Sequence, residues 1–154
     1  MTLRLAEIWD LARRFVPEAA ADRRLRESGP RSWWPAHEIG HFLVATPVEC
    51  REPRFGIDTH AETDTTVFRY VVAKEIAATS ISQRLLRAAG HAAIADEEIQ
   101  YTDEATLECS FEHWCRRRVE RLLRANKVVR LPRTRDGLAR LLARKEREVA
   151  AVSR

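Results

Sequence analysis

The chain has few cysteines and no long apolar run. Only three of its 154 residues are cysteine (Cys50, Cys109 and Cys115), and so small and odd a number favours a reducing compartment over a disulfide framework. No apolar run approaches the roughly 20 residues that are needed to cross a bilayer. The first residues lack the basic start and apolar centre of a secretory signal, and internal repeats are absent. These absences predict a single cytoplasmic domain over residues 1–154 with no membrane partner.

The composition is that of a globular protein, and its charge is unevenly distributed. Hydrophobic residues make up 45% of the chain and charged residues 32%, a balance that disordered chains do not have. Residues 116–154 hold 14 Lys or Arg against 4 Asp or Glu, a net charge of +10, whereas residues 1–115 hold 13 against 19, a net charge of −6. We therefore divide the chain into an acidic body, 1–115, and a basic C-terminal helical extension, 116–154. The extension can meet nucleic acid, an acidic partner or its own body.

Apolar residues recur mostly at helical spacing, which predicts a mostly helical α+β fold. The expected helices cover residues 5–16, about 34–46, about 64–89, a short stretch at 96–98, a segment from 102 to beyond 122, and 136–152. Thr2 and Thr102 are expected N-caps, and Gly90 is the expected C-terminal cap of the third helix. Two segments are expected to be extended: residues 48–63 as a small sheet, and residues 127–131 as a short strand.

One motif carries recognisable chemistry, His37-Glu38-Ile39-Gly40-His41 on the second expected helix. The histidines stand four residues apart, so at 3.6 residues per turn both imidazoles share one helix face and can bind a single metal ion. Zinc lowers the pKa of a bound water to roughly 7, and Glu38, about 100° around the helix from His37, can accept that water's proton. Gly40 has no side chain, which lets another backbone pass close to the site. The apolar residues after the motif indicate a buried helix, in which imidazoles and a carboxylate need a partner.

A zinc hydrolase site requires a third protein ligand. Pro47 occupies the position six residues after His41, which excludes the pattern in which a third histidine follows there. Glu75 is the best candidate, because on the long helix its carboxylate falls on the apolar face and needs a compensating cation, either a metal ion or an arginine. Further carboxylates, ranked lower, are Asp58, Glu62, Asp64, Asp96 and Asp103.

The segment from Trp33 to Leu43 resembles the metal helix of the ImmA/IrrE-type zinc metallopeptidases, in which an Ala-His-Glu-x-Gly-His core is followed by aliphatic residues. The segment from Glu75 to Leu86 is similar to that family's second signature, a glutamate ligand followed by alanine, a polar residue and a leucine pair. The resemblance implies a zincin-like minimal metallopeptidase fold, zinc bound by the two histidines and Glu75, and Glu38 as catalytic base. It also implies a protease that cleaves or regulates a DNA-binding repressor on a separate chain. A second resemblance, to membrane-tethered ATP-dependent zinc proteases, places the third ligand at Asp103 instead.

Two functional hypotheses follow from these patterns. In the first, the chain is a zinc-dependent endopeptidase-like protein whose protein or peptide substrate adds as a strand beside the metal helix. In the second, it is a non-catalytic regulatory protein of toxin–antitoxin or phage-control type, with a structural zinc and a basic tail that binds a partner or nucleic acid. The tail's sequence does not favour nucleic acid, because helical spacing scatters its arginines and few aromatic residues lie among them.

Overall fold

The computed structural model describes residues 2–16, 32–56, 65–106 and 112–152, except for the side chains at 54, 56, 65–69, 100–106 and 112–115. These residues form six α-helices and two short 3₁₀ helices: α1 (Leu5–Phe15), α4 (Trp34–Val44), η1 (Glu49–Arg51), η2 (Pro53–Gly56), α5 (Thr65–Ala88), α6 (Ala92–Thr106), α7 (Glu112–Ala125) and α8 (Arg135–Ala151). None of the helices is long and apolar enough to cross a membrane. The prediction of a mostly helical protein is confirmed.

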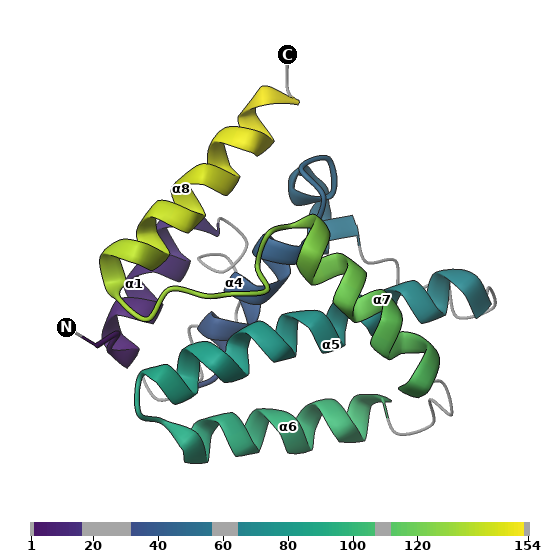
Figure 1. Ribbon diagram of the computed structural model, residues 1–154, viewed down its shortest axis with the longest axis horizontal. Coiled ribbons are helices and arrows are strands. Elements are labelled where there is room, and N and C mark those ends of the chain that lie inside the picture. Colours follow the sequence, from purple (N-terminus) through teal and green to yellow (C-terminus); the bar gives the residue numbers. More distant parts are fainter. Residues whose placement is uncertain (1, 17–31, 57–64, 107–111, 153–154) are drawn as a thin grey trace.

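Helix α5 is the centre of the fold (Figure 1). It packs against α4, α6 and α7, while α1 packs against α4 and α8. Almost every residue of α4 is buried, so this helix lies between α1 on one side and α5 on the other. The core joins these elements through fully buried side chains, among them Ile8, Ile39, Leu43, Ile81, Leu85 and Leu142. The metal motif on α4 is therefore held inside the protein, against the middle of α5.

A glycine allows α4 and α5 to approach closely. A Cβ atom added at Gly40 would lie 2.3 Å from the carbonyl oxygen of Ala78 and 2.8 Å from its Cα. Real Cβ atoms do not come so near to a backbone, so only glycine fits between the two helices. The expectation that another backbone passes beside Gly40 is confirmed, and the backbone is that of α5.

Replacing Gly40 with alanine is expected to lower the free energy of unfolding by at least about 1 kcal/mol. Alanine favours the helix by about 1 kcal/mol. The overlap is with backbone atoms, so the cost of moving them should be at least about 2 kcal/mol, in the upper part of the usual range for overpacking, and the net loss at least about 1 kcal/mol. Because the movement separates α4 from α5, we also expect weaker zinc binding, measured by competition with a chelating dye. Gly90→Ala is the control: its left-handed backbone makes alanine costly by about 1–2 kcal/mol, yet it lies away from the α4–α5 contact. Wild-type stability in Gly40→Ala would contradict the close approach.

The long helix α5 ends where its sequence predicts. Gly90 adopts a φ of +81°, in the left-handed region that favours glycine. The backbone N–H of His91 donates to the carbonyl of Leu86, and that of Gly90 donates to the carbonyl of Arg87. This cap confirms the predicted role of Gly90, and it turns the chain directly into α6 (Figure 1).

The prediction of a small sheet at residues 48–63 is wrong for the part of this segment that the structure describes. Residues 49–56 form η1 and η2, and residues 57–63 lie outside the described ranges. Two local interactions favour a turn over a strand: the backbone N–H of Thr46 donates to the Glu49 carboxylate, and that of Glu49 donates to the Thr46 hydroxyl. Phe55 has a φ of +56°, which no strand residue adopts. The described residues therefore offer no sheet edge for strand addition by a substrate.

Three smaller predictions of local structure are also wrong. Residues 127–131 form no strand, because the carbonyls of Val128 and Val129 accept hydrogen bonds from the Arg84 guanidinium instead of from a partner strand. Helix α1 begins at Leu5, not after Thr2, because the Glu7 carboxylate caps the backbone N–H of Arg4. Thr102 does not start a helix, because it lies inside α6.

The C-terminal end of α4 is capped by side chains from far along the chain. The buried ammonium group of Lys145 on α8 donates to the carbonyls of Leu43 and Ala45 and to the Asn126 side-chain oxygen. Asn126 in turn donates to the carbonyl of Val44, over 3.0 Å. Burial lowers the pKa of Lys145, but three acceptors and the negative end of the helix dipole still favour its cation. The basic region 116–154 is thus structurally joined to α4, the helix that carries the two histidines.

Candidate metal centre

The two histidines of the motif lie one turn apart on α4 and are buried. The helix starts where the Ser32 hydroxyl accepts a hydrogen bond from the backbone N–H of Trp34 over 3.1 Å, and Pro35 fits its first turn. His37 is 4% exposed and His41 is 5% exposed. Their Nε2 atoms lie 3.1 Å apart, so both imidazoles point to one place.

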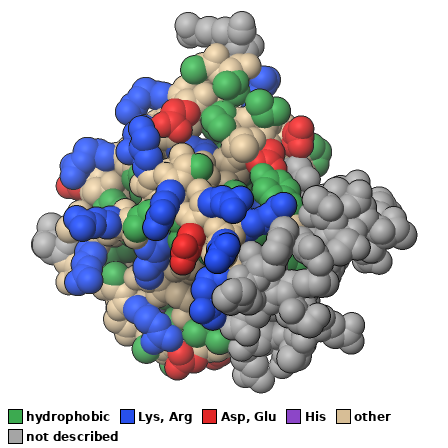
Figure 2. All heavy atoms as spheres, turned by 45° about the vertical axis from the view of Figure 1, so that its right-hand side comes forward, with side chains coloured by type: hydrophobic (Ala, Val, Ile, Leu, Met, Phe, Trp, Pro, Cys, Tyr) green, Lys and Arg blue, Asp and Glu red, His purple; other side chains and the backbone are tan. Residues whose placement is uncertain are grey.

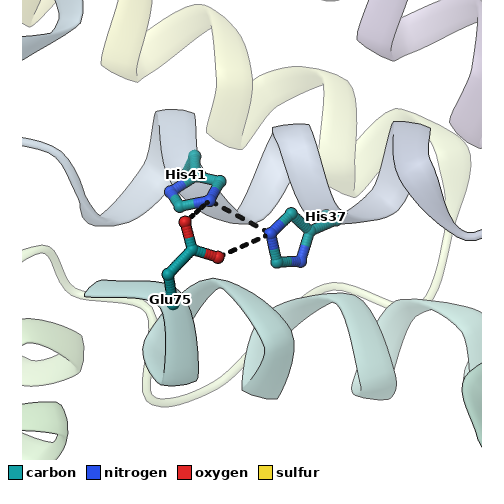
Figure 3. A group of neighbouring side chains, drawn as sticks. All are labelled: His37, His41 and Glu75. Atoms are coloured by element: carbon teal, nitrogen blue, oxygen red, sulfur yellow. Dashed lines mark hydrogen bonds and ion pairs between the residues drawn. The ribbon is translucent and has the colours of Figure 1, made fainter. Parts of the chain in front are cut away.

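Helix α5 brings a carboxylate to the same place (Figure 3). One oxygen of Glu75 lies 3.1 Å from Nε2 of His37, and the other lies 3.2 Å from Nε2 of His41. The ligand atoms of the three residues all lie within 4.8 Å of one another. Glu75 thus meets the two histidines, as predicted, and no arginine pairs with it among the described residues.

The donor set and its spacing fit zinc. Two imidazoles and one carboxylate are the protein ligands of a common class of catalytic zinc sites. With ligand distances of about 2.0–2.1 Å, tetrahedral coordination places two ligand atoms about 3.3 Å apart. The separations of 3.1–3.2 Å in this cluster are close to that value. These three side chains could therefore hold a zinc ion, with one oxygen of Glu75 facing each histidine.

The cluster shifts the pKa values of its own members. Burial alone lowers the pKa of His37, but hydrogen bonds and charge from the Glu75 and Glu98 carboxylates outweigh it and raise the pKa to about 10. Burial raises the pKa of Glu75, but the charges and hydrogen bonds of His41 and His37 hold it well below its ordinary range. Positive charge is thus favoured beside Glu75, which is the charge that a metal ion supplies.

The metal-free protein is consequently expected to lose stability in alkali. The pKa of His37 is higher in the folded protein than in the unfolded chain, where it is about 6.5. Protonated His37 therefore stabilises the fold fully below pH 6.5, and this stabilisation is lost as the pH rises through about 10. The lowered pKa of Glu75 has the opposite effect on stability. Ionised Glu75 stabilises the fold above about pH 4.5, and this stabilisation is lost as the pH falls below that value. Urea unfolding of the metal-free protein between pH 6.5 and 10 measures the alkaline loss. The zinc-loaded protein, whose ligands are deprotonated, is expected not to show it; a flat metal-free profile would contradict the shift.

A buried glutamate that the sequence analysis did not identify contacts the ring nitrogen of His37 that faces away from Glu75. Oε2 of Glu98, on α6, lies 2.9 Å from Nδ1 of His37, and the Glu98 side chain is fully buried. The Gln83 amide on α5 donates to the other Glu98 oxygen over 2.9 Å and to the carbonyl of Ala95 over 2.6 Å. A hydrogen bond from Nδ1 to a carboxylate leaves Nε2 of a neutral imidazole free to bind a metal. Glu98 is therefore the positioning residue of this site.

The signal for Glu98 was present in the sequence. It follows Ile94 and Ala95 by four and three residues, so it falls on the inward face of α6 and not on the acidic surface patch expected at residues 96–98. Asp96, an alternative third ligand, is exposed and forms an ion pair with Arg87 over 2.7 Å. The side chain of Asp103, the other alternative, lies outside the described part of the structure.

Glu98→Gln is expected to weaken zinc binding about 10–100-fold, the usual effect of changing a residue that orients a metal ligand. Glutamine keeps the size of the side chain and loses the charge that holds the Nδ1 proton. Isothermal titration with zinc measures the effect, and Glu97→Gln, on the exposed side of the same helix, is the matched control. Equal affinity in the two variants would remove Glu98 from the site.

Aromatic rings enclose both imidazoles. Trp33 and Trp34 stack on one another and present themselves edge-on to His37, with centroid distances of 5.4 and 5.9 Å. Phe55, turned inward by its positive φ, stacks on His41 at 5.7 Å. These contacts restrict the orientation of the rings and keep water from them. The side chain of Glu75, in contrast, is 36% exposed, so it is the member of the cluster most open to solvent among the three.

Glu38, the predicted catalytic base, is half-buried on α4 next to His37. Comparisons of the chain with protein-family models, with curated proteins and with solved structures find no match. The chemistry of the site is therefore inferred from its own residues.

Proposed function

We propose that the chain is a zinc-dependent hydrolase of the peptidase type, with zinc bound by His37, His41 and Glu75. The observation that carries the proposal is the convergence of two buried Nε2 atoms and one carboxylate at separations of 3.1–3.2 Å. The carboxylate behind His37 adds support, because a metal-binding histidine usually donates its second N–H to such a group.

The residues of the site divide the chemistry among them. A bound zinc supplies a Lewis acid that polarises a carbonyl and makes water more acidic. We assign to Glu38 the role of general base, which accepts a proton from the attacking water and passes it to the leaving amine. Glu98 and Gln83 keep His37 oriented throughout, and the exposed side of Glu75 admits the substrate.

The proposed substrate is a protein or peptide, and the motif resemblance favours a DNA-binding repressor on a separate chain. The described residues contain no sheet edge to which a substrate strand could add. The rings of Trp34 and Phe55, beside the two histidines, offer apolar contacts at the site instead.

Metal analysis and a hydrolysis assay on the same preparation test the proposal. We expect one zinc per chain by mass spectrometry of the metal, and cleavage of a fluorogenic peptide library that stops when a chelator removes the zinc and returns on its re-addition. Zinc without cleavage of peptides or of a candidate repressor would indicate a structural metal, as in the regulatory hypothesis. Absence of zinc binding would refute both.

A further inference from the structure

The basic C-terminal region keeps most of its positive charge on the surface, unpaired. Its two described ion pairs, Arg135–Asp136 at 3.5 Å and Arg144–Glu148 at 3.8 Å, both lie within the region. Eight exposed basic residues of the region form no ion pair within the described part of the chain. Two of them, Arg140 and Arg147, lie on α8. We call the other six, which lie on α7 and on the segment that follows it, the basic face: Arg117, Arg121, Arg124, Lys127, Arg130 and Arg133. The described part of the acidic body thus forms no ion pair with these six residues, although the body and the region have opposite net charges.

Three members of the basic face lie along one side of α7, so helical spacing does not scatter all the arginines of the region, contrary to what the sequence pattern suggested. Arg117, Arg121 and Arg124 follow the spacing i, i+4, i+7, so they share a stripe about 10 Å long. Over that length a DNA duplex carries about six phosphate charges. In Figure 2 Lys and Arg side chains are spread over much of the visible face, and few acidic side chains lie among them. The stripe is therefore long enough to contact several phosphates together.

The rest of the basic face belongs to the segment that joins α7 to α8, and its backbone is fixed. Arg84 on α5 donates to the carbonyls of Val128 and Val129 at 3.3 and 2.7 Å, and the Val128 side chain is fully buried. The backbone N–H of Leu3 donates to the carbonyl of Arg133 over 2.9 Å. Arg130 and its neighbours are thus presented from a held backbone, so little conformational freedom is lost when they bind.

We propose that the basic face binds the phosphate backbone of double-stranded DNA. Its residues are arginine in five of six cases, and the guanidinium fork matches phosphate oxygens. A protein partner needs an apolar centre at its docking surface, and the only large apolar side chain exposed in the described part of residues 116–134 is Val129. A single strand needs aromatic rings for base stacking, and the described side chains of the same segment include none. This proposal does not rest on the proposed hydrolase activity.

Fluorescence anisotropy with a labelled DNA duplex of mixed sequence tests the proposal, using the zinc-supplemented full chain over a series of salt concentrations. The variant is R121Q/R124Q, and the control is R51Q/R87Q, which removes the same charge from exposed positions outside the basic face. Each lost phosphate contact lowers the slope of log K against log salt by about 0.9. We expect R121Q/R124Q to lower the slope by about 2 and to weaken binding on the order of tenfold or more at about 0.1 M salt. The control should bind nearly as wild type does.

Three results would overturn the proposal. Equal weakening in the two double variants would mean that only net charge matters. Tighter binding of a single strand of the same length would reject the duplex as ligand. Displacement of the duplex by poly-glutamate at equal charge concentration would point to an acidic protein partner. Circular dichroism of each variant shows whether the fold is kept, and because the changed residues are exposed, an unchanged spectrum is expected.

Discussion

Glu38→Gln is expected to leave zinc bound and to lower the rate of peptide hydrolysis about 10²–10⁴-fold, the range that general-base catalysis contributes. The carboxylate is not among the three converging ligands, so its neutralisation should not release the metal. Glutamine has the same size and keeps the half-buried position filled. The rate loss should therefore appear in kcat with little change in KM.

The control for this variant is Glu52→Gln, which removes the same charge from an exposed position after η1. Metal analysis of both proteins should give one zinc per chain. Hydrolysis that survives in Glu38→Gln at more than about a tenth of the wild-type rate would rule out the proposed base. Loss of zinc from Glu38→Gln would instead make Glu38 a metal-site residue.

The second large effect is expected on metal binding. Among the residues that the structure describes, Glu75 carries the only negative charge that directly faces both Nε2 atoms. Glu75→Gln removes this charge, and an amide is a poor zinc ligand. We expect zinc affinity to fall by more than about a hundredfold, beyond the effect of changing a supporting residue such as Glu98. Competition with a chelating dye measures the affinity.

The same substitution should also change the metal-free protein. Without the Glu75 carboxylate, one of the two partners that raise the pKa of His37 is lost, so the stability of metal-free Glu75→Gln should depend less on pH in the alkaline range. Tight zinc binding in Glu75→Gln would contradict the assignment of the third ligand and would return attention to other carboxylates, Asp103 among them.

The three converging residues could be predicted because each has a signature within its own helix. The spacing of His37 and His41 defines a shared face, and Glu75 is a carboxylate on an otherwise apolar stripe. Glu98 has the same kind of signature, a carboxylate on the same face as Ile94 and Ala95. It was missed because its neighbours Asp96 and Glu97 made the whole segment resemble an exposed acidic patch.

The sheet could not be excluded from the sequence, because the deciding interactions are local contacts and a backbone angle. Val48, Phe55 and Ile57 suggested extended structure, but the reciprocal bonds of Thr46 and Glu49 start a turn. Phe55 takes a strained backbone and packs on His41. Apolar residues in a segment with proline and glycine show that something is buried, and they do not show which conformation buries it.

The cap on α4 has a consequence for the order in which the protein can mature. At the end of this helix the carbonyl of Val44 accepts a hydrogen bond from Asn126, 82 residues later in the chain. The carbonyl of Ala45 accepts one from Lys145, 100 residues later. During synthesis the helix that carries both histidines is therefore made long before the groups that finish it, and contacts of such sequence separation form slowly. A nascent chain that still lacks α8 leaves the carbonyls of Leu43 and Ala45 without the Lys145 ammonium group, so we expect the end of α4 to be fixed late, once α8 has folded onto it.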